Sequence, residues 1–378
     1  MIYLDNAATS WPKPEAVYAA IDKAGREQAG NPGRSGHALS LAAGRVVEDA
    51  RLAVASLLDL SHPERLVFTL NATDALNLAL FGFLQPGDHV VTDSLGHNSL
   101  TRPLAALETA GVAVTKVPSD PVNGVDPQEI KRSIRPATRL IAVTHVSNVA
   151  GTVNPLPEIQ AVARAAGIRL LVDASQSAGC RPLPAGVDLL AFPGHKALLG
   201  PQGTGALFTG PEIELRPLRF GGTGSFSESA TQPSIFPDRY ESGTANTPGL
   251  AGLAAGARFL QSRGLAAVAA EEARLANILW TGLADIRGVQ LYGPPPGPER
   301  AGVVSFRIAG APPADVAAIL DQSFGIAVRA GLHCAPDAHR TLGTLAGGTV
   351  RASLGPLNSE AELEVFVTAV AGIARELS

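Results

Sequence analysis

The residues of this sequence best suited to chemistry are Asp173 and Lys196, which lie at or just beyond the ends of apolar runs. Lys196 follows the run 188–192 in a glycine-rich loop, 194–203, where burial favours a neutral amine that can attack an aldehyde. Asp173 ends the run 168–173, at the strand end where open α/β sheets bind ligands, and a carboxylate there can keep a pyridinium nitrogen protonated. A solvated lysine and a capping or turn aspartate are the plainer interpretations of each residue alone. Together they predict a site for a pyridoxal-type electron sink.

Alternating strands and helices are the elements that must position these residues. Strand-like runs cover residues 65–70, 89–93, 112–117, 139–144, 168–173 and 188–192, and helical patterns cover 14–28, 39–58, 71–80 and 155–166. Strands separated by helices imply a mainly parallel sheet with helices on both faces, because a hairpin cannot supply parallel links. The strand ends then converge on one edge, which carries Thr73, His97, Asn148, Asp173, Gln176 and Lys196.

The second half of the chain has a different pattern. A long Gly-, Ser- and Pro-rich stretch, 219–238, is predicted to be irregular and functional rather than a plain connector. Helical periodicity then runs from about 250 to 286 and is followed by strands at 303–308 and 326–329 and helices at 313–321 and 360–376. These patterns predict an N-terminal arm (1–14), a large domain (15–250) and a smaller α+β domain (251–378).

Composition sets the broad class of the protein. The chain has 378 residues, of which 46% are hydrophobic and 17% charged, with a net charge of −4. This charge implies no general attraction to nucleic acid or to anionic membranes, and no apolar stretch is long enough to span a bilayer. The N-terminus shows no signal peptide, and two cysteines do not make a disulfide framework, so we expect a cytoplasmic protein.

The segment Asp173-Ala174-Ser175-Gln176-Ser177, followed some twenty residues later by Gly194-His195-Lys196, resembles the class V aminotransferase fold of pyridoxal-phosphate enzymes. Within that fold the chain resembles the cysteine desulfurases with a short active-site cysteine loop, from Leu4-Asp5-Asn6-Ala7-Ala8 to Arg351-Ala352-Ser353-Leu354. The resemblance implies an α/β fold of type I, with a mainly parallel seven-stranded sheet between helices and a smaller α+β C-terminal domain. It also implies an obligate homodimer in which Thr244 reaches the neighbouring subunit's site.

The resemblance assigns roles to particular residues. Lys196 holds pyridoxal phosphate as a Schiff base, His97 stacks on its ring, and Cys334 is the nucleophile. The cofactor-binding residues are Ala72, Thr73, His97, Asn148, Asp173, Gln176, His195, Lys196 and Thr244, and the substrate-binding residues are Asn148, Arg351 and His37. The implied reaction converts L-cysteine to L-alanine, and the sulfur passes as a persulfide on Cys334 to a small acceptor protein or a reductant.

Plainer interpretations accompany several of these assignments. The stretch at Ala72 and Thr73 also reads as an ordinary capped helix that offers an anion pocket, and His37 and His97 also read as loop histidines. Arg351 also fits a structural salt bridge, although a guanidinium suits two-point binding of a carboxylate.

The two cysteines are interpreted differently. Cys334 would attack as a thiolate, which His333 would favour only if the two side chains met, and its plainer interpretation is a small buried residue. Cys180 follows Ala178 and Gly179 with no charged partner nearby, so we interpret it as packing. His333, Cys334 and His339 lie close in sequence, but zinc usually takes four ligands and no second cluster has ligand spacing, so no metal site is predicted.

One departure from the family pattern concerns the phosphate. Pro193 stands where the family usually has a Ser or Thr hydroxyl, and proline supplies neither a hydroxyl nor an amide N–H. The departure implies either a lower affinity for the cofactor or compensation by Thr73, His195 and Thr244.

The sequence is also compatible with other functions. A selenocysteine lyase, a transaminase or an epimerase would share the fold, although a transaminase does not need Cys334. A binding protein without catalysis is disfavoured by the joint presence of Asp173, His97, Lys196, Cys334 and Arg351. A dinucleotide dehydrogenase would carry Gly-x-Gly-x-x-Gly after its first strand, and this chain does not.

Overall fold

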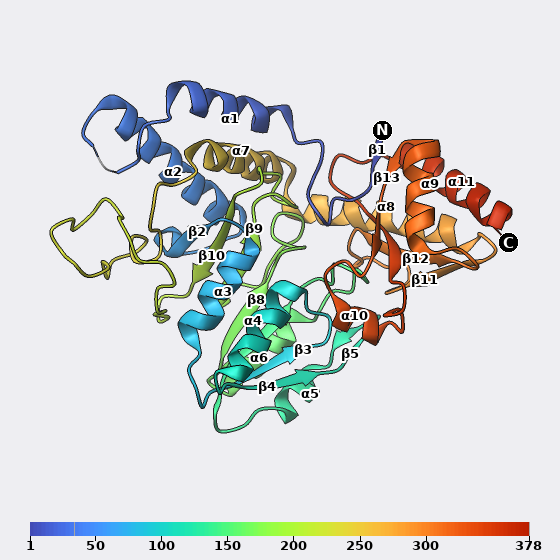
Figure 1. Cartoon of the computed structure of the whole chain (residues 1–378), viewed down its shortest axis with the longest axis horizontal. Coiled ribbons are helices and arrows are strands. Elements are labelled where there is room, and N and C mark those ends of the chain that lie inside the picture. The colour runs from blue at the N-terminus through green and yellow to red at the C-terminus, as the bar shows by residue number, and fades with distance from the viewer. Residues whose placement is uncertain (34, 378) are drawn as a thin grey trace.

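A seven-stranded sheet forms the centre of the larger lobe (Figure 1). The computed structural model describes residues 1–33 and 35–377, so residue 34 of the glycine-rich loop 30–37 and residue 378 lie outside it. In spatial order the strands are β2 (Leu66–Thr69), β10 (Gly205–Thr209), β9 (Leu189–Pro193), β8 (Arg169–Asp173), β7 (Thr138–Thr144), β3 (His89–Asp93) and β4 (Ala113–Val117). Only β10 runs antiparallel to its neighbours, so the prediction of a mainly parallel sheet is confirmed.

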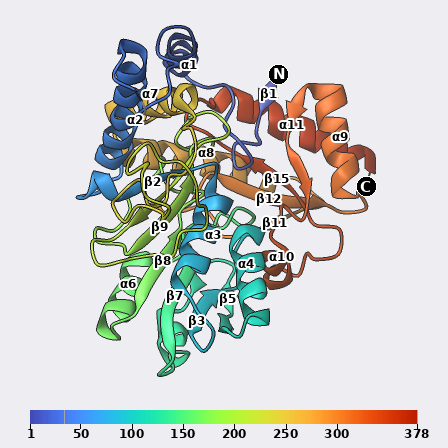
Figure 2. The ribbon, with the colours of Figure 1, turned by 60° about the vertical axis from the view of Figure 1, so that its left-hand side comes forward.

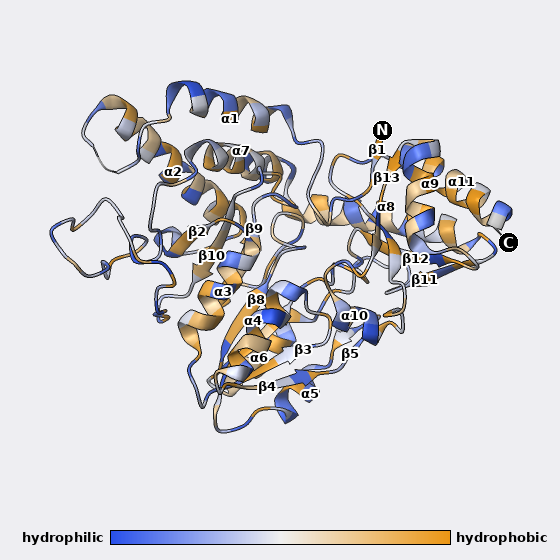
Figure 3. Cartoon of the chain, viewed as in Figure 1, coloured by the Kyte–Doolittle hydropathy of each residue, from blue (hydrophilic) through white to orange (hydrophobic). Residues whose placement is uncertain are grey.

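Helices cover both faces of this sheet because its buried strands are apolar on both sides. In β8, Leu170 and Val172 face one core, and Leu171 faces the other. The first core is closed by α2 (Ala38–Leu57), α5 (Pro127–Arg132), α6 (Leu156–Ala165) and α7 (Thr247–Arg263), and α1 (Glu15–Glu27) packs on α7. The second core is closed by α3 (Ala72–Phe83) and α4 (Asn98–Thr109), whose apolar residues appear in Figure 3.

The smaller lobe is built on an antiparallel sheet with its own core, as the turned view in Figure 2 shows. Its strands, in spatial order, are β11 (Val289–Tyr292), β12 (Val303–Ile308), β15 (Thr349–Ser353) and β14 (Arg329–Gly331). Helices α8 (Leu265–Ala284), α9 (Pro313–Phe324) and α11 (Glu360–Leu377) pack on this sheet, and α10 (Pro336–Thr341) follows the cysteine segment. A separate hairpin joins β5 (Ser119–Asp120) to β6 (Gly124–Val125).

The N-terminal segment pairs with the smaller lobe. Strand β1 (Ile2–Tyr3) runs parallel to β13 (Ile326–Ala327), and Asp5 forms a bridge with Ser353. The chain then crosses to α1 on the larger lobe (Figure 1). The arm therefore contacts both lobes, while the division of the chain at residues 14 and 250 stays a prediction.

Two elements differ from the sequence patterns. The helical region predicted from 250 to 286 is two helices, because Gly264 takes a φ of 77° between α7 and α8. The strand predicted at 326–329 is also divided, since β13 pairs with the N-terminal strand and β14 pairs with β15. Among the described residues, no helix combines the length and apolarity needed to cross a membrane.

Candidate active site

A cleft of ≈ 310 Å³ lies where the carboxyl ends of β7, β8 and β9 meet β14 and β15 of the smaller lobe. It brings together most of the residues predicted for the site, namely Ala72, Thr73, His97, Asn148, Asp173, Gln176, His195, Lys196 and Arg351. Cys334 borders an adjoining groove that shares Thr73, His97 and Ser99 with the cleft. Residues far apart in the sequence therefore form one continuous surface from Lys196 to Cys334.

Lys196 and Asp173 are positioned by two neighbouring parallel strands. Asp173 is the last residue of β8, is 2% exposed, and accepts a hydrogen bond from the Ser175 amide at 3.0 Å. Burial raises the pKa of the Asp173 carboxyl. Lys196 follows β9, and burial lowers its pKa to about 8 although the charge of Asp173 acts in the opposite direction. The amine is therefore partly neutral near physiological pH, as a nucleophile or proton carrier requires.

Two histidines in the cleft are held neutral. His97 begins α4, where its Nδ1 accepts a hydrogen bond from the Ser99 amide at 3.0 Å, so the neutral ring carries its proton on Nε2. Burial, and then the charge of Lys196, lower its pKa to about 4. The same two causes, in the same order, lower the pKa of His195 to about 4, and its Nδ1 lies 3.1 Å from the Thr9 hydroxyl.

Helix α3 presents its N-terminus to one end of the cleft. Asn71 caps the helix by accepting from the Asp74 amide, and the Thr73 hydroxyl lies 2.7 Å from the Ser99 hydroxyl. Pro193 lines the cleft at this end without a hydroxyl of its own. Backbone N–H groups at a helix N-terminus and two hydroxyls make a setting suited to phosphate.

Arg351 enters the cleft from β15 with its side chain 1% exposed. One of its amino groups, Nη2, contacts Asp5 Oδ1 at 2.6 Å, and Nη1 donates to the Asn148 carbonyl at 3.0 Å. Its Nε is buried and has no partner among the described residues. Burial lowers the pKa of Arg351, and the Asp5 carboxylate opposes that effect.

Cys334 is exposed and sits in a strained turn after β14. It and His333 have φ values of 57° and 48°, in the left-handed region that non-glycine residues rarely adopt. The ring of His333 points away from the thiol: its Nε2 lies 3.2 Å from the Thr349 hydroxyl, and burial first of all lowers its pKa to about 2. His333 therefore supplies no positive charge, whereas Arg329 Nη2 donates to Cys334 Sγ at 3.5 Å.

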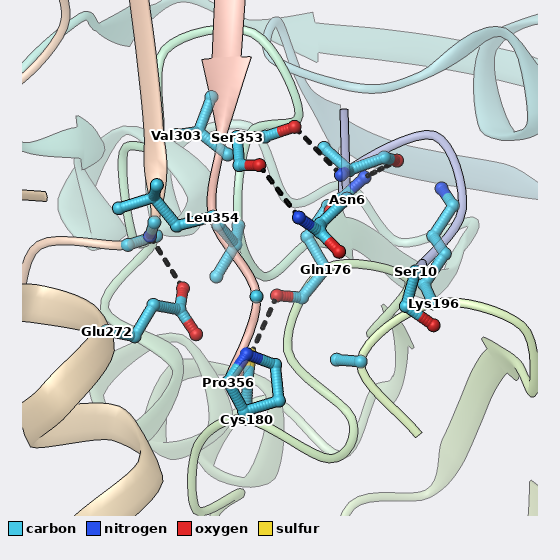
Figure 4. A pocket seen from close by; sticks show the side chains of 16 residues that line it. Asn6, Ser10, Gln176, Cys180, Lys196, Glu272, Val303, Ser353, Leu354 and Pro356 are labelled. Carbon is cyan, nitrogen blue, oxygen red and sulfur yellow. Dashed lines mark hydrogen bonds between the residues drawn. The ribbon is translucent and has the colours of Figure 1, made fainter. Parts of the chain in front are cut away.

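A second cavity lies beside the cleft, and Figure 4 shows Lys196 and Glu272 entering it from opposite sides. Cys180 lines this cavity, is 4% exposed, and donates to the Gln176 carbonyl at 3.3 Å. Burial, and next the charge of Glu272, raise its pKa well above the usual thiol range. The expectation that Cys180 has no charged neighbour was wrong, because α8 brings Glu272 to it from far along the chain and Arg181 follows it directly.

Two predicted residues lie away from the cleft of their own chain. Thr244 borders a different cavity with Arg51, Glu241 and Arg219. His37 is exposed and begins α2, accepting a hydrogen bond from the Ser40 amide. Among the described residues that line the cleft, neither is present, so their predicted contacts with cofactor or substrate stay predictions.

Three residues of the site are not predicted from the sequence. Arg329 stands in the segment that contains Cys334, and Ser99 stands two residues after His97, so each was within reach of a motif-based argument. Asp5 meets Arg351 across nearly the whole chain, and nothing in its local sequence indicates that contact. Among the residues that the structure describes, no group of three or more His, Cys, Asp and Glu side chains could hold a metal ion.

Comparison with known proteins gives a consistent result. Residues 2–366 match the family described as Aminotransferase class-V. A probable cysteine desulfurase of Methanothermobacter thermautotrophicus is 37% identical over 97% of this chain and 92% of its own length. A cysteine desulfurase of Haloferax volcanii is 35% identical over 100% of this chain and 90% of its own length. The structure of a cysteine desulfurase from Thermococcus onnurineus superposes with a TM-score of 0.92 at 35% identity, covering 100% of this chain and 95% of that one.

Proposed function

The chain belongs to the class-V aminotransferase family, and from this premise we propose that it is a pyridoxal-phosphate-dependent cysteine desulfurase. It converts L-cysteine to L-alanine and carries the sulfur as a persulfide on Cys334. The observation that carries this proposal is that Lys196, with its lowered pKa, shares a cleft with the buried Asp173 while a free thiol stands at the rim. Transamination needs the first two groups but has no use for the third.

The residues of the cleft fit pyridoxal phosphate. The N-terminus of α3 and the hydroxyls of Thr73 and Ser99 offer donors to a phosphate at one end, where Pro193 offers none. Asp173, buried beneath the cleft, would hold a protonated ring nitrogen, His97 would lie against the ring, and Lys196 would attach it covalently. When bound, pyridoxal phosphate supplies the electron sink that allows bonds beside the amino-bearing carbon to break.

The protein side chains then divide the remaining work. Lys196 Nζ, with a pKa of about 8, takes up and returns protons near neutral pH. Arg351 has its Nε left for the substrate carboxylate, since its other two nitrogens are bonded to Asp5 and Asn148. The Cys334 thiolate attacks the substrate sulfur, and a sulfur–sulfur bond forms as the carbon–sulfur bond of the substrate breaks.

The proposal extends to assembly and surroundings. The protein acts in the cytoplasm as a homodimer, in which Thr244 contacts the cofactor phosphate of the partner's site. A small acceptor protein or a thiol reductant removes the sulfur from Cys334, which is exposed as this transfer requires.

The test measures alanine and sulfide released from L-cysteine by the pyridoxal-phosphate-loaded protein with dithiothreitol as reductant. We expect equal amounts of both products, and a loss of at least about a hundredfold in Cys334→Ala, because the nucleophile is removed. Cys180→Ala is the matched control and should retain most of the activity, since that thiol is buried. A native protein that shows the cofactor spectrum but releases neither product would contradict the proposal, and alanine formed only from L-selenocysteine would make it a selenocysteine lyase.

A further inference from the structure

The two arginines that reach the cleft from the smaller lobe are neighbours in the sheet but differ in their partners. Arg329 on β14 pairs in register with Arg351 on β15, and both line the cleft. Arg351 is buried and bonded to a carboxylate, Asp5. Arg329 is partly exposed, and among the described residues no carboxylate lies within ion-pair distance of it. Within the described part of the chain, its side chain donates one hydrogen bond, from Nη2 to the sulfur of Cys334 at 3.5 Å.

The backbone around Cys334 holds the sulfur in this place. Two residues of the larger lobe donate hydrogen bonds to successive backbone carbonyls of the turn. Asn148 Nδ2 donates to the His333 carbonyl at 2.8 Å, and the Asn98 amide donates to the Cys334 carbonyl at 2.8 Å. The left-handed conformation of both residues is thus fixed by contacts from outside their own segment. The fold therefore fixes the backbone of Cys334 in a place from which its sulfur reaches Arg329.

The charge of Arg329 also reaches the rest of the site. It is among the charges that lower the pKa values of His97, Lys196 and His333, although burial is the larger cause for all three. A guanidinium with no ion-pair partner among the described residues thus contacts the thiol and acts electrostatically on the lysine, and a thiolate is favoured beside an arginine.

We propose that Arg329 is a catalytic residue that holds the sulfur of Cys334 as an anion before the attack and holds the terminal sulfur of the persulfide after it. The inference rests on the proposed function. In the overall step Cys334–SH and L-cysteine become Cys334–S–SH and L-alanine: one sulfur–sulfur bond forms, one carbon–sulfur bond breaks, and its electron pair takes a proton at carbon. No external oxidant or reductant is needed, and the arginine remains charged throughout.

The contact between Arg329 and Cys334 is tested without turnover. The loaded enzyme, free of substrate, is treated with iodoacetamide at pH 7.5, and mass spectrometry follows the alkylation of each cysteine. We expect Arg329→Gln to slow the alkylation of Cys334 about five- to tenfold, the effect of one partly screened charge. Arg329→Lys should restore part of the rate, because the charge is kept but the fork geometry is lost.

Two controls make the result specific. Arg102 borders the same groove as Cys334 without a recorded contact to it, so Arg102→Gln should leave the alkylation rate within about twofold of native. Cys180 is buried and should stay unmodified in every variant that folds. The cofactor absorbance of each variant verifies that the cleft has formed.

Steady-state kinetics then separate the possible roles. We expect Arg329→Gln to lower kcat for alanine formation about tenfold with little change in the KM for L-cysteine. Unchanged alkylation of Cys334 would overturn the proposal, and unchanged alkylation with a raised KM would make Arg329 a ligand of the substrate carboxylate instead. If the native enzyme forms no alanine but Arg329→Gln still slows alkylation, the proposed function fails while the contact between Arg329 and Cys334 stands.

Discussion

The floor of the cleft and its rim obtain their chemistry in different ways. The floor carries Asp173 and Lys196, which are fixed by adjacent buried strands of one sheet. The rim carries Arg329 and Cys334, which lie in a short strand and a left-handed turn of the other lobe. Burial tunes the floor, since it is the first cause of both pKa shifts there. The rim relies on nearby fixed charges, because its sulfur is exposed.

This difference indicates how the reaction is divided. The groups proposed to exchange protons lie where burial moves their pKa values. Cys334, proposed to hand sulfur to a second molecule, is exposed, so that molecule can reach it. The two regions also belong to different lobes, so their relative position depends on the contacts that join the lobes, among them the one between Arg351 and the Asn148 carbonyl.

The largest effect is expected from removing the amine of Lys196 from the floor of the cleft. Lys196→Ala should lower alanine formation at least about a thousandfold and abolish covalent attachment of pyridoxal phosphate, because both proton transfer and attachment use this amine. Borohydride reduction followed by mass spectrometry detects the attachment.

Lys13 supplies the matched control for this variant. Burial also lowers its pKa to about 8, but its amine donates to the Ser10 carbonyl at 3.0 Å and to the Ser10 hydroxyl at 2.8 Å. Lys13→Ala should therefore keep the attachment and most of the activity. If borohydride still fixed the cofactor in the cleft of Lys196→Ala, another amine would be the one that attaches it.

A smaller effect is expected at the contact between Asp5 of the N-terminal arm and Arg351 of the smaller lobe. Asp5→Asn leaves the buried guanidinium of Arg351 without its carboxylate, and should lower the free energy of unfolding by about 2–3 kcal/mol. Urea denaturation of the native protein and the variant measures the difference.

Asp22→Asn is the control for that measurement, because Asp22 and Arg26 form an ion pair that is mostly exposed. Its loss should change the free energy of unfolding by less than about 0.5 kcal/mol. Equal losses in the two variants would mean that the contact between Asp5 and Arg351 stabilises the protein no more than an exposed ion pair does.

The floor was largely predictable from the sequence, whereas at the rim Cys334 was predicted and its contact with Arg329 was not. Apolar runs followed by Asp173 and Lys196 identify strand ends, and parallel strands bring such ends to one edge by rule. The partner of Cys334 depends instead on a left-handed turn that the local sequence does not predict, since neither His333 nor Cys334 is a glycine, the residue that adopts this conformation routinely. The neighbouring histidine was the obvious partner by sequence, yet its ring is buried beside Thr349 and Arg329 takes that place.

Long-range contacts escaped prediction for the same reason. Asp5 with Arg351 and Cys180 with Glu272 are each joined by packing between elements far apart in the chain. Short-period patterns also do not reveal where a helix is interrupted, as at Gly264, or that neighbouring residues such as Ala327 and Arg329 enter different sheets.

The smallest expected effect is the pH dependence of the rate at which the apoprotein attaches pyridoxal phosphate. A neutral amine attacks the aldehyde, so the rate at which apoprotein attaches pyridoxal phosphate should rise as Lys196 loses its proton. With a pKa of about 8, this rate should rise about tenfold between pH 7 and pH 9 and then level off. His333 adds no titration in this range, because burial lowers its pKa to about 2. Stopped-flow absorbance measures the rate, with butylamine as the reference amine. A rate that keeps rising beyond pH 10, as it should for butylamine, would mean that burial does not tune the floor, and the contrast between the two regions would be lost.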